Sequence, residues 1–212
     1  MTKRPKEPEK RPYDLGKRLE QMDESRAAIL RAAKAQLTAK GYPRLTMASL
    51  AAESGVTRQT IHNLFGTKTG VLEAVFDLIA LDSGMERMRE VMMQPPGDAQ
   101  LVKFVGIFCG FWARNRMLLR RVHGIGAIDP EFGRVIEARN RRRWMAATRI
   151  VETLGRGDGD PQQRAAALAA LTSFEFFDAL AESCGSEAEA EAIVLGLVRR
   201  ALALRDAGDA GH

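Results

Sequence analysis

The sequence predicts an all-α fold, and three observations support that prediction. Apolar residues recur three and four positions apart over most of the chain, and no segment alternates as a β-strand does. Glycine, proline and capping residues separate these segments at helical lengths. Residues 46–68 have the spacing of a helix-turn-helix. We expect about nine helices, arranged as a three-helix helix-turn-helix head and a larger helical domain.

Composition and charge narrow the class of protein. The chain has 212 residues, of which 45% are hydrophobic and 28% charged, as in ordinary globular proteins. The net charge of +5 arises near the N-terminus, where residues 1–18 carry seven Lys or Arg against three Asp or Glu. Residues 83–212 are nearly neutral, with eighteen against seventeen. This distribution favours an anionic partner without identifying it.

Cysteine, histidine and apolar patterns disfavour several other classes. Cys109 and Cys184 lack metal-type spacing, and two cysteines in a chain of this length fit a reducing cytoplasm. No apolar run of about 18 residues predicts a membrane span. The three histidines are scattered, and neither a glycine-rich phosphate loop nor a paired-histidine motif occurs. We therefore expect a cytoplasmic protein that is not an enzyme and has no metal site or cofactor.

Residues 1–22 are expected to form a disordered, basic arm, since their first part holds three prolines and alternates in charge. One interpretation is a solvated tail. The other is an arm that follows DNA phosphates or enters a minor groove. That role would fall to Arg4, Lys10, Arg11, Lys17 and Arg18.

The first helix is expected to begin near Asp23 or Ser25, because either residue can act as an N-cap. Gly41 is placed to end the helix, and Pro43 prevents its continuation. One face is apolar at helical spacing and is formed by Ile29, Leu30, Ala33 and Leu37.

The helix-turn-helix begins where Thr46 caps a short helix over residues 47–54. Ala51 permits a close helix crossing, since it adds little bulk where the two helices touch. Gly55 can adopt the positive φ of the turn without steric cost. Ile61 then packs the second helix onto the first, so three constraints at the right offsets support the motif.

The second helix of the motif, over about residues 58–64, is expected to start at the N-cap Thr57. Its outward residues are Arg58, Gln59, Thr60 and His62. Arg58 can recognise guanine and Gln59 adenine in a major groove. Helix N-terminal amides and Lys68 would attract phosphates.

A linking helix is expected over residues 67–94, with Thr67 as its cap and an apolar face of Leu72, Val75, Phe76 and Ile79. The Gln-Pro-Pro-Gly segment at residues 94–97 ends it. We therefore divide the chain into an arm, a DNA-binding head with the start of the linking helix, and a ligand-binding and dimerisation domain, over residues 1–22, 23–82 and 83–212.

Beyond residue 98, every segment has helical periodicity. The run from His123 to Gly126 is interpreted as the end of the first body helix. The helices expected here cover residues 101–113 with a short continuation over 115–122, then 130–154, 161–183 and 187–204. The arginines among residues 139–143 are interpreted as a solvated face.

Aromatic residues gather in this larger domain, where they are either simple core or the lining of a pocket for an apolar or aromatic ligand. The candidate ligand-binding residues are Phe104, Phe108, Trp112, His123, Trp144, Phe174, Phe177 and Asp178. Apolar stripes on the last two expected helices predict a four-helix dimer bundle, the alternative being packing within one chain. These stripes comprise Leu168, Leu171, Phe174, Leu180, Ile193, Leu197 and Leu204.

The segment over residues 26–79 resembles the TetR (TetR/AcrR) family of bacterial transcriptional regulators. The residues that carry the resemblance are Ile29, Leu30, Ala33, Gly41, Tyr42, Thr46, Leu50, Ala51, Gly55, Val56, Thr57, Thr60, Ile61, Phe65, Lys68 and Leu72. The resemblance implies an all-helical homodimer with a three-helix DNA-binding head and a divergent domain that binds a small molecule.

By the same resemblance, Thr46 and Lys68 match positions that contact phosphates. His62 stands where most members have a tyrosine that contacts the DNA backbone, and Asn63 where a second aromatic residue is common. Gln59 replaces a frequent glycine and Gly70 a frequent glutamate. The DNA-binding residues predicted are Thr46, Thr57, Arg58, Gln59, Thr60, His62, Asn63 and Lys68.

The function expected from the sequence is transcriptional regulation through DNA binding. The preferred form is a homodimeric repressor that binds an inverted-repeat operator on double-stranded DNA and is released by a small, mainly apolar effector. The alternatives are a regulator without a ligand, controlled by abundance or a protein partner, and an activator. No membrane partner is expected.

Overall fold

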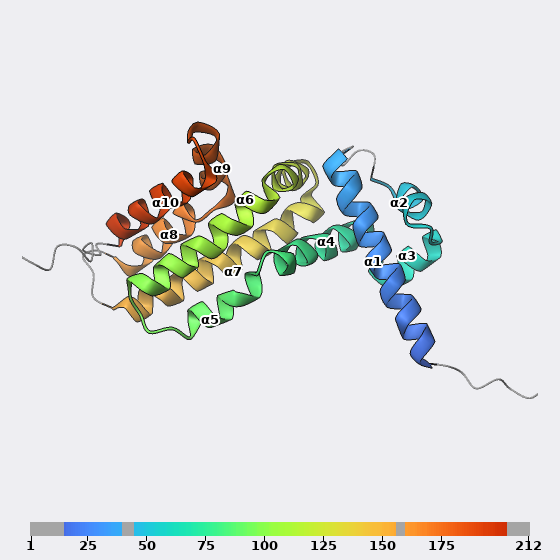
Figure 1. Cartoon of the computed structure of the whole chain (residues 1–212), viewed down its shortest axis with the longest axis horizontal. Coiled ribbons are helices and arrows are strands. Elements are labelled where there is room, and N and C mark those ends of the chain that lie inside the picture. Colours follow the sequence, from blue (N-terminus) through green and yellow to red (C-terminus); the bar gives the residue numbers. More distant parts are fainter. Residues whose placement is uncertain (1–14, 40–44, 156–159, 203–212) are drawn as a thin grey trace, which may run out of the picture.

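The molecule is elongated, with a small helical head at one end and a larger helical body at the other (Figure 1). The computed structural model describes residues 15–39, 45–155 and 160–202, and within these ranges every regular element is a helix. The all-α fold with a three-helix head is therefore as expected. The described residues form ten α-helices and one short 3₁₀ helix. Two of the expected helices are each broken, whereas the helix expected over residues 101–113 and its continuation over 115–122 form one helix.

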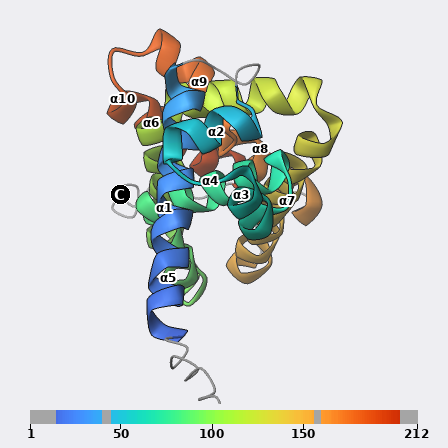
Figure 2. The ribbon, with the colours of Figure 1, turned by 90° about the vertical axis from the view of Figure 1, so that its right-hand side faces the viewer.

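The head consists of α1 (Leu15–Ala39), α2 (Met47–Ser54) and α3 (Arg58–Phe65), and Figure 2 views the molecule from this end. Since α1 begins at Leu15, the expectation that order starts near residue 23 was wrong. The last proline of the arm is at position 12, and the residues after it are mostly good helix formers. Arg4, Lys10, Arg11, Gly41 and Pro43 lie outside the described residues, whereas Lys17 and Arg18 belong to α1.

The core of the head forms where the apolar faces of the three helices meet. Ile29, Ala33 and Leu37 of α1 are fully buried, as are Leu50 of α2 and Ile61 of α3. Local caps fix where these helices start and stop. Thr46 and Ser49 form a reciprocal capping box at the start of α2. Gly55, which follows the end of α2, has a left-handed φ of 73°. Because Gly55 takes this φ without strain, the two helices meet as the sequence predicts.

Helix α4 (Lys68–Asp82) joins head to body and contacts α1, α3 and α7. The expectation of one linking helix up to residue 94 was wrong, because α4 ends at Asp82 and the chain turns at Ser83 and Gly84. The φ of Gly84 is 77°. Asn115 donates a 2.8 Å hydrogen bond to the Ser83 hydroxyl, and Arg114 a 3.0 Å bond to its carbonyl. A 3₁₀ helix (Met85–Arg87) and the short α5 (Met88–Met92) follow. The helix that joins head and body is therefore α4, which ends at Asp82.

The body is built around two long antiparallel neighbours, α6 (Asp98–Ile128) and α7 (Pro130–Leu154). The expected helix end at residues 123–126 was wrong, since α6 continues through them to Ile128. Its glycine at 126 faces α7, where it opposes Gly133. These glycines are therefore the point at which the two helices cross closely, and the turn itself is made by Asp129, which caps α7.

We expect Gly133→Ala to lower the free energy of unfolding by about 1–3 kcal/mol, the usual cost of overpacking. A Cβ at this position would lie 2.8 Å from the carbonyl oxygen of Gly126, which belongs to the backbone and cannot rotate away. Urea unfolding at matched protein concentration measures the loss. The control is Gly110→Ala, where a Cβ meets nothing within 4 Å among the described residues. Equal stability of the two variants would contradict this account of the crossing.

The remaining helices are α8 (Pro161–Leu171), α9 (Phe174–Ser183) and α10 (Glu187–Ala201). The single helix expected over residues 161–183 was wrong, because it breaks at Thr172 and Ser173. The Thr172 hydroxyl donates back to the carbonyl of Leu168 at 2.7 Å, and Ser173 caps α9. Trp112 donates to the Thr172 carbonyl at 3.1 Å, which satisfies the group freed by the break. Leu204 lies outside the described residues.

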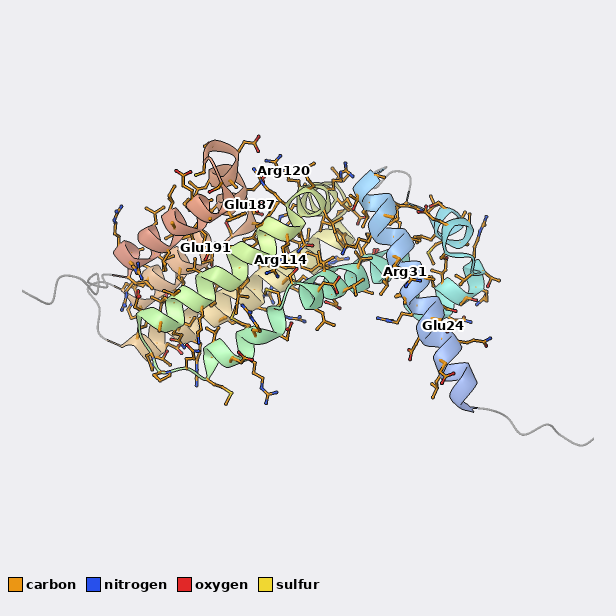
Figure 3. All side chains as sticks on the ribbon, viewed as in Figure 1. Glu24, Arg31, Arg114, Arg120, Glu187 and Glu191 are labelled. Atoms are coloured by element: carbon orange, nitrogen blue, oxygen red, sulfur yellow. The ribbon has the colours of Figure 1, made fainter. Side chains whose placement is uncertain are left out.

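Charged side chains extend from the outer surfaces of head and body alike, as Glu24 and Arg31 on α1 and Glu187 on α10 illustrate (Figure 3). Helix α1 of the head packs against α6 of the body and against α4, and polar contacts add to this packing. Arg121 of α6 donates a 2.6 Å hydrogen bond to the carbonyl of Leu37 near the end of α1, and Lys34 pairs with Asp82 of α4 at 3.6 Å. Within the described residues, no helix has the length and apolarity needed to cross a membrane.

Candidate nucleic-acid interface and ligand cavity

One face of α3 is polar and exposed, and the opposite face is buried in the head. Thr57 accepts a 3.1 Å hydrogen bond from the amide of Thr60, which fixes the start of the helix. Ile61 points into the core and is fully buried. The residues left exposed on the outer side are Arg58, Gln59, His62 and Asn63. A helix that packs against the head with one face and exposes polar side chains on the other can enter a major groove.

Two of the exposed side chains already bond to each other. The Gln59 amide donates to the Asn63 carbonyl oxygen at 2.8 Å, one helical turn away. The hydroxyls of Thr57 and Thr60 lie 2.9 Å apart, and Thr60 is half-buried. Base contacts by Gln59 would therefore exchange one hydrogen bond for others. In contrast, the Arg58 side chain stands exposed at the first position of the helix.

The expected phosphate-contacting residues lie at two helix N-termini. Thr46 is exposed and accepts from the amide of Ser49 at 3.0 Å, so its hydroxyl stays at the start of α2. Lys68 opens α4 next to its cap Thr67 and is half-buried. Burial lowers the pKa of Lys68, and the nearby Asp129 carboxylate acts in the opposite direction. Backbone amides at these two N-termini add partial positive charge.

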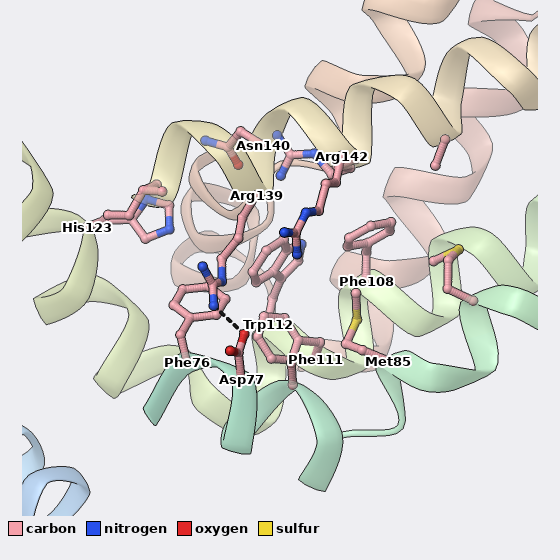
Figure 4. A pocket seen from close by; sticks show the side chains of 15 residues that line it. Phe76, Asp77, Met85, Phe108, Phe111, Trp112, His123, Arg139, Asn140 and Arg142 are labelled. Carbon is pink, nitrogen blue, oxygen red and sulfur yellow. Dashed lines mark hydrogen bonds and ion pairs between the residues drawn. The ribbon is translucent and has the colours of Figure 1, made fainter. Parts of the chain in front are cut away.

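A cavity of about 240 Å³ lies in the body between α4, α6 and α7, next to the 3₁₀ turn (Figure 4). This is slightly below the range of roughly 300–1,000 Å³ typical of ligand sites. Most of its wall is aromatic or aliphatic. The lining residues are Phe76, Asp77, Ala80, Met85, Met88, Phe108, Phe111, Trp112, His123, Ile136, Arg139, Asn140, Arg142, Arg143 and Ala146.

Three of the eight ligand-binding residues predicted from the sequence line this cavity, namely Phe108, Trp112 and His123. Phe174 supports them from behind, with its ring 5.6 Å from that of Trp112 and 4.7 Å from that of His123. Phe104 and Phe177 are buried in the core. Trp144 is 46% exposed on another side of α7. Asp178 pairs with Arg116 at 2.6 Å and with Arg120 at 2.8 Å.

Three arginines on α7 line the cavity, and two of them, Arg139 and Arg143, are half-buried, which corrects the interpretation of residues 139–143 as a solvated face. Arg139 pairs with Asp77 of α4, and its guanidinium lies 4.4 Å from the centre of the Phe76 ring (Figure 4). Arg143 lies one turn further on, with its guanidinium 6.0 Å from the Trp112 ring. Spacing of four residues puts both on one helix face. That spacing was the signal in the sequence that could have identified them.

His123 lines the cavity and forms a hydrogen bond with Glu175 of α9. The His123 Nδ1 atom lies 2.8 Å from a Glu175 oxygen. This hydrogen bond is the main reason why the pKa of Glu175 falls to about 2, and Arg143 lowers it further through space. Glu175 is therefore ionised at neutral pH, and its carboxylate already has His123 as a hydrogen-bond partner.

Burial raises the pKa of the Cys109 thiol to about 12, so this group is not a nucleophile at neutral pH. No group of three His, Cys, Asp or Glu residues in the described ranges is arranged to hold a metal ion. The arrangement instead offers a polar helix face and, some distance away, an apolar cavity with basic groups at its wall.

Comparisons with known proteins agree with this arrangement. Residues 29–75 match the model of the bacterial regulatory proteins of the tetR family. A protein assigned as a TetR-family transcriptional regulator from Syntrophomonas wolfei has a similar structure, with a TM-score of 0.70 at 17% identity, covering 87% of this chain and 98% of that one. No curated protein matches the chain in sequence.

Two further solved structures share the fold. A TetR transcription regulator from Haloarcula marismortui gives a TM-score of 0.65 at 15% identity, covering 85% of this chain and 97% of its own. A protein assigned as a transcriptional regulator from Saccharomonospora viridis, in complex with choline, gives 0.65 at 19% identity, covering 84% and 96%. At these identities the likeness is one of fold.

Proposed function

We propose that this chain, which carries a TetR-family DNA-binding region on a TetR-family regulator fold, is a homodimeric repressor released by a small, mainly apolar ligand. One observation carries the proposal. Helix α4 has its first turn against α3 of the head, while Phe76, Asp77 and Ala80 of its second half line the cavity in the body. A single rigid helix thus touches both the DNA-binding element and the ligand space.

DNA recognition is assigned to α3, with Arg58 and Gln59 contacting bases and His62 and Asn63 contacting bases or backbone. Thr46 and Lys68 contact phosphates on either side, and Thr57 and Thr60 hold the helix start. Two heads related by a twofold axis would contact half-sites one helical turn, or a multiple of it, apart. The operator is therefore an inverted repeat.

Dimerisation is assigned to the C-terminal helices. Ile193 of α10 is 37% exposed, and Leu171, Leu180 and Leu197 are only half-buried within one chain. Leu168 and Phe174 are buried within the chain and so contribute to its own core rather than to a partner. Half-buried apolar residues on neighbouring helices support association with a second copy.

Ligand control follows from a two-state dimer. The ligand binds better to the form whose recognition helices are spaced wrongly for DNA, and DNA binds better to the other. Helix α4 moves between these forms as a lever from Lys68 to Asp82, shorter than the sequence indicated. Arg139 attaches the lever to α7, through Asp77 and through a 3.2 Å hydrogen bond to the carbonyl of Glu73.

The proposal is tested by sequencing the fragments that the protein selects from genomic DNA and by sedimentation of the protein with the selected site. We expect an inverted repeat, a dimer at micromolar concentration, and two chains per site. A monomer, or a selected site without repeat symmetry, would refute the dimeric mode of binding.

The effector is tested by screening small molecules for thermal stabilisation, since a ligand at a hundred times its Kd stabilises by about 2.7 kcal/mol. We expect stabilising compounds that also lower the affinity for the selected site. Stabilising compounds that leave DNA affinity unchanged would indicate a regulator controlled by other means. The position of the selected DNA site relative to nearby promoters would distinguish a repressor from an activator.

A further inference from the structure

The basic groups in the wall of the cavity differ in whether their charge is already paired. Arg139 is engaged by Asp77, by the carbonyl of Glu73 and by the Phe76 ring. His123 is engaged by Glu175 at 2.8 Å. Arg142 is exposed to solvent. These three groups need nothing further from a ligand.

Arg143 is the exception. Its Nε and Nη1 atoms are shielded from solvent and have no hydrogen-bond partner within the described residues. Among the described residues, the Glu175 carboxylate acts on Arg143 through space, and it already bonds to His123. Burial accordingly lowers the pKa of Arg143. A shielded guanidinium with unmade hydrogen bonds is costly, and an anion that reaches it recovers that cost.

The wall beside Arg143 fixes what else the ligand must be. Trp112, Phe108 and Phe76 give an aromatic surface, and Met85 and Met88 give a deformable one. Among the charged residues that line the cavity, three are arginines and one is an aspartate. Because Asp77 is paired with Arg139, the free charge facing a ligand is positive. A cation such as the choline seen in one fold neighbour would meet repulsion here.

We propose that the effector is a small organic acid with an aromatic or short aliphatic body, whose carboxylate accepts a charge-assisted hydrogen bond from the Arg143 guanidinium at Nε or at Nη1. A carboxylate binds a guanidinium more strongly than a neutral carbonyl oxygen does, because donor and acceptor are both charged. The apolar body lies against Trp112 and Phe108. This inference rests on the proposed function, because it names the chemical class of the ligand of that same cavity.

The test compares ligands that share a body and differ in charge. The probes are phenylacetate, phenylacetamide and phenethylamine, with octanoate and octylamine as a second body. The chain has two tryptophans, so in a Trp144→Phe background the emission of Trp112 alone reports occupancy of the cavity. We expect an acid of at least one body to bind about tenfold or more tighter than its neutral or cationic counterpart.

Variants then assign the effect to one side chain. Arg143→Met should lower the affinity for the acid at least about tenfold while leaving the amide unchanged, and should raise Tm without ligand because the unpaired charge is gone. The matched control is Arg149→Met, which removes an equal charge from an exposed position of the same helix. It should change neither quantity.

Three outcomes overturn the inference. The first is binding of the amine or amide as tightly as the acid, the second is an unchanged acid affinity in Arg143→Met, and the third is no binding of any acid at millimolar concentration. Operator affinity is measured separately for the same variants. Acid binding without operator release would refute the proposed regulation and support the proposed ligand class. Operator release by the amines alone would support the proposed regulation and refute the proposed ligand class.

Discussion

Arg58→Ala should lower affinity for the operator by about thirtyfold to ten-thousandfold while barely changing affinity for random DNA. A bidentate arginine contact to guanine discriminates by about 1–3 kcal/mol, and a twofold dimer makes that contact twice. Arg58 is exposed at the first position of α3, so truncating its side chain exposes no core. The measurement is fluorescence anisotropy with operator and scrambled duplexes at one fixed salt concentration.

Three further variants separate base contacts from general electrostatics. Gln59→Ala should also relax base preference, with a smaller effect because the Gln59 amide must first leave Asn63. Lys68→Ala should weaken operator and random DNA alike and reduce the salt dependence of binding. Arg149→Ala removes one exposed positive charge from the body and should change neither. Equal losses on operator and random DNA for Arg58→Ala would contradict the assignment of base recognition.

The head could be predicted from the sequence because its decisive interactions are local. Thr46, Thr57 and Thr67 each cap a helix through an amide three residues on, and Gly55 takes the left-handed turn conformation. Such interactions depend on residue type and short spacing alone. The start of α1 was not predicted, because helix propensity extends this helix toward the N-terminus beyond its buried residues.

The cavity could not be predicted in the same way, because its wall is assembled from five helical segments between residues 76 and 146. Arg139 and Arg143 appeared as part of a charged run, and only the packing of α7 against α4 and α6 separates them from their exposed neighbours. The end of α4 is likewise set by Asn115, which lies 32 positions from Ser83 in the chain. Partners this far apart leave no short-range pattern in the sequence. The aromatic content therefore indicated which domain holds the cavity, but it did not indicate which residues line it.

Gly70 lies where the first turn of α4 meets the end of α3, and here the close approach concerns DNA binding directly. Its amide donates to the Thr67 side chain at 3.1 Å, which caps α4. A Cβ on Gly70 would overlap the carbonyl oxygen of Phe65 and lie 3.2 Å from the carbonyl carbon. Both are backbone atoms of the recognition helix, so no side-chain rotation relieves the overlap. A residue with a side chain at this position must move α3 relative to α4.

We therefore expect Gly70→Ala to lower operator affinity by about a hundredfold or more, because a shift of α3 misplaces base contacts in both half-sites. The free energy of unfolding should fall by about 1–3 kcal/mol from overpacking. The control is Gly124→Ala on α6, an exposed helical position with nothing within 4 Å among the described residues, which should gain up to about 1 kcal/mol from helix propensity. Operator titration and urea unfolding measure the two effects separately. If Gly70→Ala matched the original protein in both, α3 would not be held against α4 at this contact, and the path from cavity to recognition helix would have to run elsewhere.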